Sequence, residues 1–487
     1  MLASPQAINF RLLGEKSFQK YLFIAIPLLV LEVTIFKLFY PYADFFSDSY
    51  SYIFAAAADL NVNLWPIGYS RFIQLFHHIS HSDTALVVCQ YFLIQGATLY
   101  LLFTVFYYYR PGVLVQKLLF YVLMLNPLIL YLSNYISSDG LFLALSLIWA
   151  AQLIKILHKP GFLLIVVHSL LILFAFTVRY NAIYYPIISG LAYLLSRWKL
   201  SFKLIGFLLP VVLIGVFVGY TSEQTRKVTG TKQFSVFGGW QLANNAMYML
   251  PHIQVDQTPP PACKEFHKLV LTFLEKAGPQ LTALGPSDGA FYLKEPTAPL
   301  KGYLELKTGN QVDSSGGIAS WGTFSPIYSA YGTFLIRNYP FSFARYFLLP
   351  NTYNYFVPPI EKLEVYNLGS RSVFPIASYW FDYPKDQVKV VSFHAQKTIL
   401  LLYPALFGGL NLMFVGFLVG WYRNRKHRRE EPLFNRTIVL MAVLLLANAC
   451  FSILASPIVF RYQVFPMVLL IIFSGLLAEK VEVTSKS

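Results

Sequence analysis

A carboxylate set among hydroxyl groups follows the first long apolar stretch of the chain. Residues 46–52 read Phe-Ser-Asp-Ser-Tyr-Ser-Tyr, with Asp48 at the centre and Tyr50 close by, soon after the apolar stretch ends at about Tyr40. Ionisable side chains at the edge of a membrane are costly and mark functional sites. The pattern therefore predicts acid–base chemistry at Asp48. The competing interpretation is the N-cap of an interfacial helix, a position that Ser and Asp favour.

Three later positions repeat the pattern of an ionisable side chain at the end of an apolar run. They are Asp139 after two serines, Arg179 before Tyr180 and Asn181, and Arg461 before Tyr462 and Gln463. Guanidinium groups bind phosphate through paired hydrogen bonds, so Arg179, Arg461 and Tyr462 predict a phosphate or pyrophosphate site. The alternative for the arginines is snorkelling to the lipid headgroups. Asp139 predicts a second catalytic acid, although Ser-Ser-Asp-Gly before an apolar run is also an N-cap signature.

The composition places the chain in the membrane. It has 487 residues, of which 56% are hydrophobic and 13% charged, whereas soluble domains carry about 25% charged residues. The net charge of +15 lies in short segments between apolar runs. Such segments are typical of orientation signals and argue against a nucleic-acid partner. The three cysteines predict no disulfide framework.

About ten stretches approach the roughly twenty apolar residues that a membrane helix requires. They lie at about 21–40, 84–108, 112–133, 140–157, 161–178, 181–197, 203–220, 397–421, 434–455 and 464–479. With the basic N-terminus inside, the short basic loops also fall inside. Asp48, Asp139, Arg179 and Arg461 then share the outer face of an all-α polytopic membrane protein.

Two outer segments are too long to be simple turns. The first, 41–83, contains apolar periodicity that predicts two short interfacial helices, at about 49–60 and 66–79. The second, 221–396, is predicted to be a soluble segment of mixed secondary structure on the extracytoplasmic side. The chain then divides into an N-terminal transmembrane module, the soluble segment and C-terminal transmembrane helices, at 1–220, 221–396 and 397–487.

The soluble segment carries helical patterns and turn-rich tracts. Helices are expected at about 264–276 and 326–347, and one turn-rich tract is Ser-Ser-Gly-Gly at 314–317.

Aromatic and amide side chains alternate in places where a sugar or an acceptor is expected to bind. Aromatic rings stack on the CH groups of sugars while amides exchange hydrogen bonds with hydroxyls. The candidates are Tyr50, Tyr69, Trp240, Asn244 and Asn245. The alternative for the last three is an ordinary domain core with capped helices.

The histidines at 77, 78 and 81 form a small cluster in the first outer loop. His77 and His81 share a helix face, but zinc requires three or four ligands. Histidines on the polar face of an interfacial helix are the favoured interpretation, so no metal ligand is predicted and a divalent metal is left open.

These features together resemble the integral-membrane glycosyltransferases of the GT-C fold, which include protein O-mannosyltransferases, lipid A aminoarabinose transferases and oligosaccharyltransferase catalytic subunits. The resemblance rests on Asp48 in the first outer loop, Asp139 at a later outer turn, and Trp-Pro-Ile-Gly-Tyr-Ser at 65–70, which is similar to a Pro-Gly-Tyr segment of many bacterial members. The chain departs from the family in having one acid among serines at 46–52 in place of the paired Asp-Glu of the mannosyltransferases. It also carries the soluble segment between the seventh and eighth spans.

The resemblance implies an inverting transferase that takes a sugar from a polyprenyl-phosphate donor on the extracytoplasmic face. Asp48 would be the general base, Arg179 and Arg461 would hold the donor phosphate, and a lipid, glycan or protein would be the acceptor. A bacterial inner membrane is the expected location.

Two other function classes compete with this interpretation. A polysaccharide polymerase or ligase would rely on arginines of the long outer segment, such as Arg345. A transporter or flippase of lipid-linked glycans would place ionisable groups at mid-membrane depth.

Overall fold

Among the residues that the structure describes, eight helical segments are long and apolar enough to cross a bilayer, so the chain is an integral membrane protein. The computed structural model describes residues 16–309 and 317–485, and within them it contains helices and two isolated β-bridges but no strand. The spanning segments are α2 (Lys16–Phe39), α5 (Asp83–Tyr109), α6 with α7 (Val113–Met124, Pro127–Asn134), α8 (Ser138–His158), α11 (Leu200–Thr229), α20 with α21 (Ala395–Leu400, Tyr403–Arg423), α23 (Pro432–Ala455) and α24 (Val464–Ser485).

Two of the ten predicted spans correspond to shorter helices. Helix α9 (Phe162–Val178) has 17 residues and α10 (Tyr185–Leu195) has 11, below the roughly twenty that a bilayer core requires. The apolar stretch before α10 is interrupted by a 3-10 turn at Tyr180–Tyr184, and Pro186 lies in the first turn of the new helix. The predicted number of spans is therefore supported for eight of the ten.

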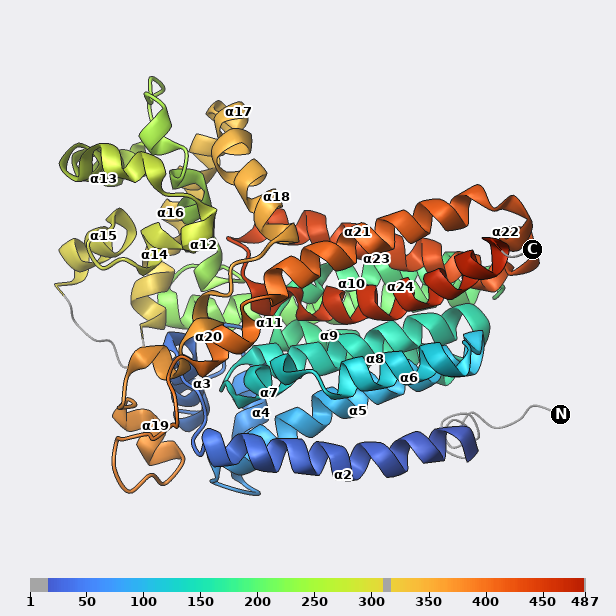
Figure 1. The fold of residues 1–487 in the computed structure, drawn as a ribbon. Coiled ribbons are helices and arrows are strands. Elements are labelled where there is room, and N and C mark those ends of the chain that lie inside the picture. The colour runs from blue at the N-terminus through green and yellow to red at the C-terminus, as the bar shows by residue number, and fades with distance from the viewer. Residues whose placement is uncertain (1–15, 310–316, 486–487) are drawn as a thin grey trace.

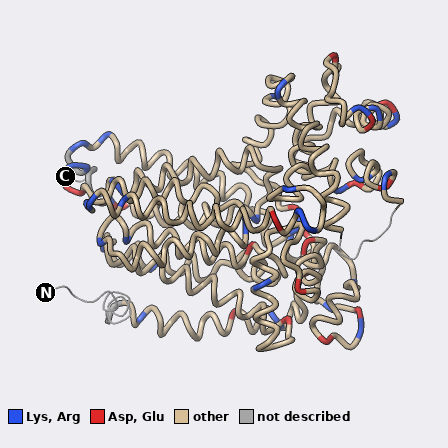
Figure 2. The backbone as a smooth tube through the Cα atoms, turned by 180° about the vertical axis from the view of Figure 1, so that it is seen from behind, with Lys and Arg blue, Asp and Glu red and all other residues tan. Residues whose placement is uncertain are grey.

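Helix α8 is the central helix of the bundle, with 89% of its spanning window buried. It packs against α5, α9, α10, α23 and α24. Figure 1 shows the spanning helices side by side, with α22 (Arg425–Glu430) and the start of α2 at one end and α3 (Ser47–Ala57) at the other. Lys and Arg gather at the α22 end, while acidic and basic residues converge inside the opposite end (Figure 2).

The segment 41–83, predicted to be the first outer loop, forms two short helices. Helix α3 begins two residues before the predicted range 49–60, and α4 (Gly68–His77) lies within the predicted range 66–79. Helix α4 begins against the last turn of α9. A Cβ atom at Gly68 would lie 2.6 Å from the backbone oxygen of Thr177, so only glycine permits this approach. The contact fixes the loop next to Arg179, which directly follows α9.

The long segment after α11 is helical where the structure describes it, rather than mixed as predicted. Helix α11 extends beyond the predicted boundary to Thr229. The following helices are α12 (Val236–Met247), α13 (Lys264–Ala277), α14 (Phe291–Lys294), α15 (Pro299–Thr308), α16 (Ile318–Asn338), α17 (Pro340–Phe343), α18 (Leu349–Phe356) and α19 (Pro375–Trp380).

Two helices of this segment test the sequence patterns directly. The helix predicted at about 264–276 is α13. The helix predicted at 326–347 begins earlier, at Ile318, and is interrupted after Asn338, where Pro340 starts α17 and a π-helical turn at Ala344–Leu348 leads into α18. Proline lacks the backbone N–H that would continue α16. Most of the turn-rich tract at 314–317 lies outside the described residues.

Candidate functional site

A short backbone bridge brings the first outer loop against the turn before α8. The N–H of Asp44 donates to the carbonyl of Asn134 at 2.9 Å, and the N–H of Ile136 donates to the carbonyl of Asp44 at 3.1 Å. The chain then enters α3 after Asp44 and α8 after Ile136. The bridge thereby places the first turns of α3 and α8, with Asp48 and Asp139, at the same end of the bundle.

Asp139 pairs with both predicted arginines. Its Oδ1 forms an ion pair with Nη1 of Arg179, and its Oδ2 accepts from Nη1 of Arg461 at 2.7 Å and from Oγ of Ser137 at 2.8 Å. The Asp139 side chain is 4% exposed and that of Arg461 9%. Both carboxylate oxygens are therefore occupied by guanidinium groups, so Asp139 is placed to orient the arginines and not to accept a proton.

Aromatic rings hold the two guanidinium groups in position. The Tyr462 ring centroid lies 4.8 Å from Cζ of Arg179 and 4.9 Å from Cζ of Arg461, and the Tyr462 hydroxyl accepts from Nη2 of Arg461 at 3.1 Å. Phe46 packs against the other side of Arg461, with 5.0 Å between Cζ and the ring centroid. Cation–π contacts of this kind are strongest when the groups are desolvated.

Asp48 faces a lysine that the sequence did not single out. Its Oδ2 lies 3.8 Å from Nζ of Lys362, and its Oδ1 accepts from Oγ of Ser47 at 3.2 Å. The ammonium group also lies 4.1 Å from the centroid of Phe46, the same ring that contacts Arg461. Asp48 is 18% exposed, so its carboxylate is accessible where that of Asp139 is not.

The segment 359–368, which carries Lys362, is connected to the site by hydrogen bonds of its backbone. The Phe460 N–H donates to the carbonyl of Pro359 at 2.8 Å, and the Tyr135 hydroxyl donates to the carbonyl of Lys362. The Asn367 N–H donates to Oδ1 of Asp44 at 2.8 Å. These contacts join it to the turns that position Asp139 and Arg461.

Three residues of this segment adopt positive φ without being glycine, namely Glu361, Asn367 and Leu368. Such conformations are strained and persist only where the surroundings impose them, often at functional sites.

Burial and neighbouring charges change the acid–base properties of this segment. Burial lowers the pKa of Lys362 to about 8, with Asp48 opposing the shift. Burial disfavours the charged form of Glu361, but its ion partner Lys294, together with Arg461 and Lys362, lowers its pKa. Burial raises the pKa of Asp44 to about 8, against the hydrogen bond from Asn367. Asp44 is therefore a structural carboxyl group, and Lys362 is a cation at neutral pH.

The structure tests the capping interpretation of the two acids. The N-cap of α3 is Phe46, and Asp48 accepts no backbone N–H in the part of the chain that is described. The N-cap of α8 is Ser137, whose Oγ accepts from the Asp139 N–H at 3.3 Å. Both carboxylates lie in first helical turns, where the helix dipole favours negative charge, and both point to cations.

The residues predicted to bind a sugar or an acceptor are not gathered at this cluster. Trp240 and Asn244 have no exposed surface and Asn245 has 2%. Trp240 stacks on Trp321 and donates to its carbonyl at 2.9 Å. Asn245 donates to the carbonyl of Ala455 at the end of α23. These contacts correspond to the alternative interpretation, a helical core, and leave no surface for a sugar.

The two candidate tyrosines of the first outer loop, Tyr50 and Tyr69, pack against other aromatic rings. Tyr69 is fully buried, donates to Gln90 at 2.8 Å and packs edge-on against Tyr52. Tyr52 in turn donates to Oγ of Ser138, the first residue of α8, at 3.0 Å. Tyr50 is half-buried and packs against Phe374. Tyr52 therefore links α3 to α8, and the buried Tyr69 packs against Tyr52.

The histidine cluster is held by stacking. His77 stacks between His81 and Trp380, and Nδ1 of His81 lies 2.7 Å from Oδ2 of Asp382. Within the described residues, no group of three or more His, Cys, Asp or Glu side chains is placed to hold a metal ion.

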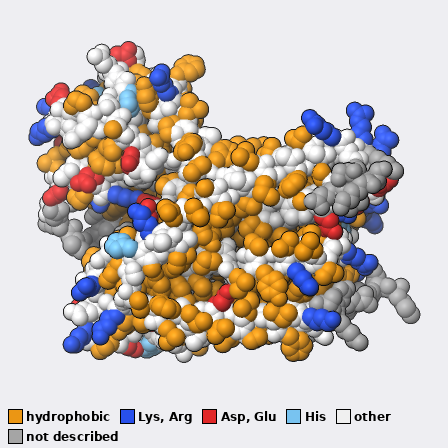
Figure 3. Space-filling view, in the orientation of Figure 1, with side chains coloured by type: hydrophobic (Ala, Val, Ile, Leu, Met, Phe, Trp, Pro, Cys, Tyr) orange, Lys and Arg blue, Asp and Glu red, His pale blue; other side chains and the backbone are white. Residues whose placement is uncertain are grey.

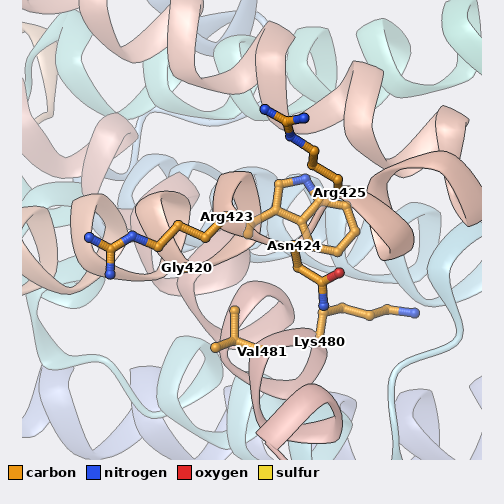
Figure 4. Close-up of a pocket in the computed structure, with 7 residues that line it drawn as sticks. Gly420, Arg423, Asn424, Arg425, Lys480 and Val481 are labelled. Carbon is orange, nitrogen blue, oxygen red and sulfur yellow. The ribbon is translucent and has the colours of Figure 1, made fainter. Parts of the chain in front are cut away.

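A cavity of about 510 Å³ lies at the opposite, basic end of the bundle, between α21, α22 and α24. Figure 4 shows the charged ends of Arg423, Arg425 and Lys480 around it, pointing away from one another. A site that closes around an anion requires convergent donors, so this cavity is not comparable to the cluster at Asp139.

Comparison with known proteins gives no assignment, because no family model, no curated protein and no solved structure matches the chain.

Proposed function

We propose that the protein is a membrane glycosyltransferase that moves a sugar from a polyprenyl-phosphate donor to an acceptor hydroxyl on the extracytoplasmic face. The observation that carries the proposal is the convergence of Arg179, Arg461 and Lys362 around Asp139 and Asp48 at one end of the bundle. The opposite end is basic, as expected for a cytoplasmic face. A bacterial inner membrane fits this orientation.

The cluster has the charge and the donors that an anionic group requires. Three cations face two carboxylates, which leaves one net positive charge, since Glu361 is neutralised by Lys294. The Nε atom of Arg461 is buried and has no hydrogen-bond partner. Buried donors are almost always paired, so an orphaned guanidinium N–H in a buried site favours a ligand oxygen. A phosphate oxygen supplies such an acceptor.

The two carboxylates have different tasks in this proposal. Asp48 accepts the proton of the acceptor hydroxyl as the hydroxyl oxygen attacks the anomeric carbon of the sugar. The bond from that carbon to the phosphate oxygen breaks, and polyprenyl phosphate leaves. Arg179, Arg461 and Lys362 neutralise the charge that grows on the leaving phosphate, a term that commonly dominates catalysis. Asp139 keeps the arginines apart and oriented.

Binding and transfer can be tested separately with purified protein in nanodiscs. Titration with a polyprenyl phosphate by native mass spectrometry measures binding, and release of free polyprenyl phosphate from a panel of radiolabelled polyprenyl-phosphate sugars measures transfer to acceptors in a membrane extract. Asp48→Asn is expected to bind the lipid phosphate as tightly as the wild type and to release none above background. Arg461→Gln is expected to weaken binding by more than tenfold, because hydrogen bonds to charged groups contribute about 1.5–3 kcal/mol.

Arg71→Gln is the matched control, because Arg71 belongs to the same outer loop as Asp48 but pairs with Asp59 and not with a residue of the cluster. It should bind and transfer normally. If Arg461→Gln bound polyprenyl phosphate as well as Arg71→Gln did, the phosphate site would lie elsewhere. If Asp48→Asn retained transfer, the proposed general base would be wrong.

A further inference from the structure

A stripe of exposed side chains runs along the segment from α17 to α18. Phe341 is 90% exposed, Leu349 65%, Tyr353 66% and Phe356 44%, and Arg345 is the exposed residue between the first two. The spacing of about four residues places all five on one face of the continuous helical segment formed by α17, the π turn and α18. The opposite face, with Phe343 and Phe347, is buried. Four large apolar side chains on one helix face form a surface that water does not favour.

The charge of this region is one-sided. Residues 317–360 contain no Asp or Glu, whereas they contain Arg337 and Arg345. Apolar side chains on one face, with Arg as the only charge, are typical of helices that lie at an anionic lipid surface.

The base of the stripe is anchored to the membrane bundle. Asn351 donates to the carbonyls of Ile453 and Ser456 at the end of α23, both at 2.8 Å, and the Tyr355 hydroxyl donates to Asn448 at 3.1 Å. Helix α18 also packs on α21. These contacts fix where the segment leaves the bundle.

The stripe continues the lipid-facing surface of the bundle. Leu402 and Leu406, at the start of α21, are 68% and 55% exposed. Phe356, at the end of α18, lies against Gly408 of the same helix α21. Figure 1 shows α18 and α17 running outward at a steep angle to the long axis of the bundle, and therefore along the plane of a membrane around it. In Figure 3 hydrophobic side chains cover the upper flank of the bundle and recur on the part that projects beside it.

We propose that the face formed by Phe341, Arg345, Leu349, Tyr353 and Phe356 lies in the lipid headgroup region of the leaflet on the side of the Asp139 cluster. The apolar side chains enter the acyl boundary, and Arg345 contacts lipid phosphate. From residue 341 to residue 356 the helical path is about 24 Å long, at about 1.5 Å per residue. This contact holds the projecting helices α12 to α18 against the membrane surface, and it does not depend on which reaction the protein catalyses.

The test is spin-label depth measurement in nanodiscs of phosphatidylethanolamine and phosphatidylglycerol. Phe341→Cys, Leu349→Cys and Tyr353→Cys are labelled one at a time with a nitroxide, in full-length protein carrying Cys89→Ala and Cys450→Ala. The remaining Cys263 is buried. Glu275→Cys on α13 is the matched control, an exposed helical position in the same projecting segment. Collision rates with oxygen, which partitions into lipid, and with a water-soluble nickel chelate are measured at each position.

The proposal expects the ratio of oxygen to nickel collisions to be several-fold higher at all three stripe positions than at residue 275. A ratio equal to that of the control would mean that the stripe faces water, and would overturn the proposal. Low collision rates with both reagents would mean that protein covers the stripe, either a second copy or another partner, and would overturn it equally. Because these positions are exposed, the labels are expected to leave the fold intact, and the far-UV circular dichroism spectrum of each variant checks this.

Discussion

The ion network at Asp139 makes a quantitative prediction. Asp139→Asn keeps the size of the side chain and removes a carboxylate that contacts both Arg179 and Arg461. Two unit charges about 4 Å apart interact by about 4 kcal/mol at an effective dielectric constant of about 20. Removing one member of a buried pair typically costs about 3–5 kcal/mol, because the partner stays buried and uncompensated. With two partners and 4% exposure, we expect the upper part of this range.

A second substitution distinguishes electrostatics from packing. In the Asp139→Asn background, Arg179→Gln removes one of the two uncompensated cations. The double variant should therefore be more stable than the sum of the single effects by more than about 1 kcal/mol, as for residues that share one network. Phosphate binding should not recover, because one of its proposed ligands is gone.

The assay is reversible unfolding in mixed detergent micelles, followed by far-UV circular dichroism. Asp59→Asn is the matched control, since Asp59 also pairs with an arginine but its side chain is 73% exposed. Exposed pairs contribute little to stability, so this variant should unfold like the wild type. If Asp139→Asn unfolded like Asp59→Asn, and if its effect were additive with Arg179→Gln, the carboxylate would not hold the two guanidinium groups and the proposed site would lose its centre.

Two further predictions concern Lys362, which the sequence analysis did not identify, and Trp240, which it placed among the sugar-binding candidates. Because the pKa of Lys362 is about 8, its charge is present below that pH and lost above it, so kcat/KM for the donor should fall as the pH rises through 8. Lys362→Met should abolish this fall and raise the donor KM about tenfold or more. Lys362→Arg should move the fall to higher pH. A fall that persists in Lys362→Met would assign it to another group. Trp240→Ala should destabilise the fold by about 3–5 kcal/mol, as for a buried Trp, and leave the donor KM of the folded fraction unchanged; a raised KM with unchanged stability would restore the sugar-binding interpretation.

The sequence was sufficient to identify candidate site residues whose type differs from that of their apolar neighbours. Asp48, Asp139, Arg179 and Arg461 stand out because each interrupts or ends an apolar run, and the alternation of spans places them on one face. This shared face predicts that they lie at one end of the bundle. It does not predict which side chains meet, so the sequence could not indicate that both oxygens of Asp139, a predicted catalytic acid, are paired with guanidinium groups.

Lys362 could not be found in this way. It lies in a polar segment where Glu-Lys pairs are ordinary, and only contacts distant in sequence, from Tyr135 and Phe460, bring it to the site. Trp240 shows the opposite limit: an aromatic residue between amides suits both a sugar platform and a core, and only its burial decides. The two short helices, α9 and α10, were overestimated because hydropathy does not register the 3-10 turn between them.

The location of the charges also bears on the transporter alternative. A transporter exposes its substrate groups alternately to both faces and places them near mid-membrane depth. Asp139 lies in the first turn of α8, Arg179 directly after α9 and Arg461 just before α24, so the network occupies helix ends.

Two ionisable groups elsewhere in the spans have tyrosine hydroxyls as partners. Glu32 accepts from the Tyr91 hydroxyl at 2.6 Å, and Lys155, in the last turn of α8, donates to the Tyr100 hydroxyl at 2.7 Å. Alternating access would require the Asp139 network to dissociate while α8, the most buried of the spanning helices, moved among its neighbours. A constellation fixed by three cations, two carboxylates and a backbone bridge is instead suited to holding a phosphate in one position, which is the requirement of a transfer reaction.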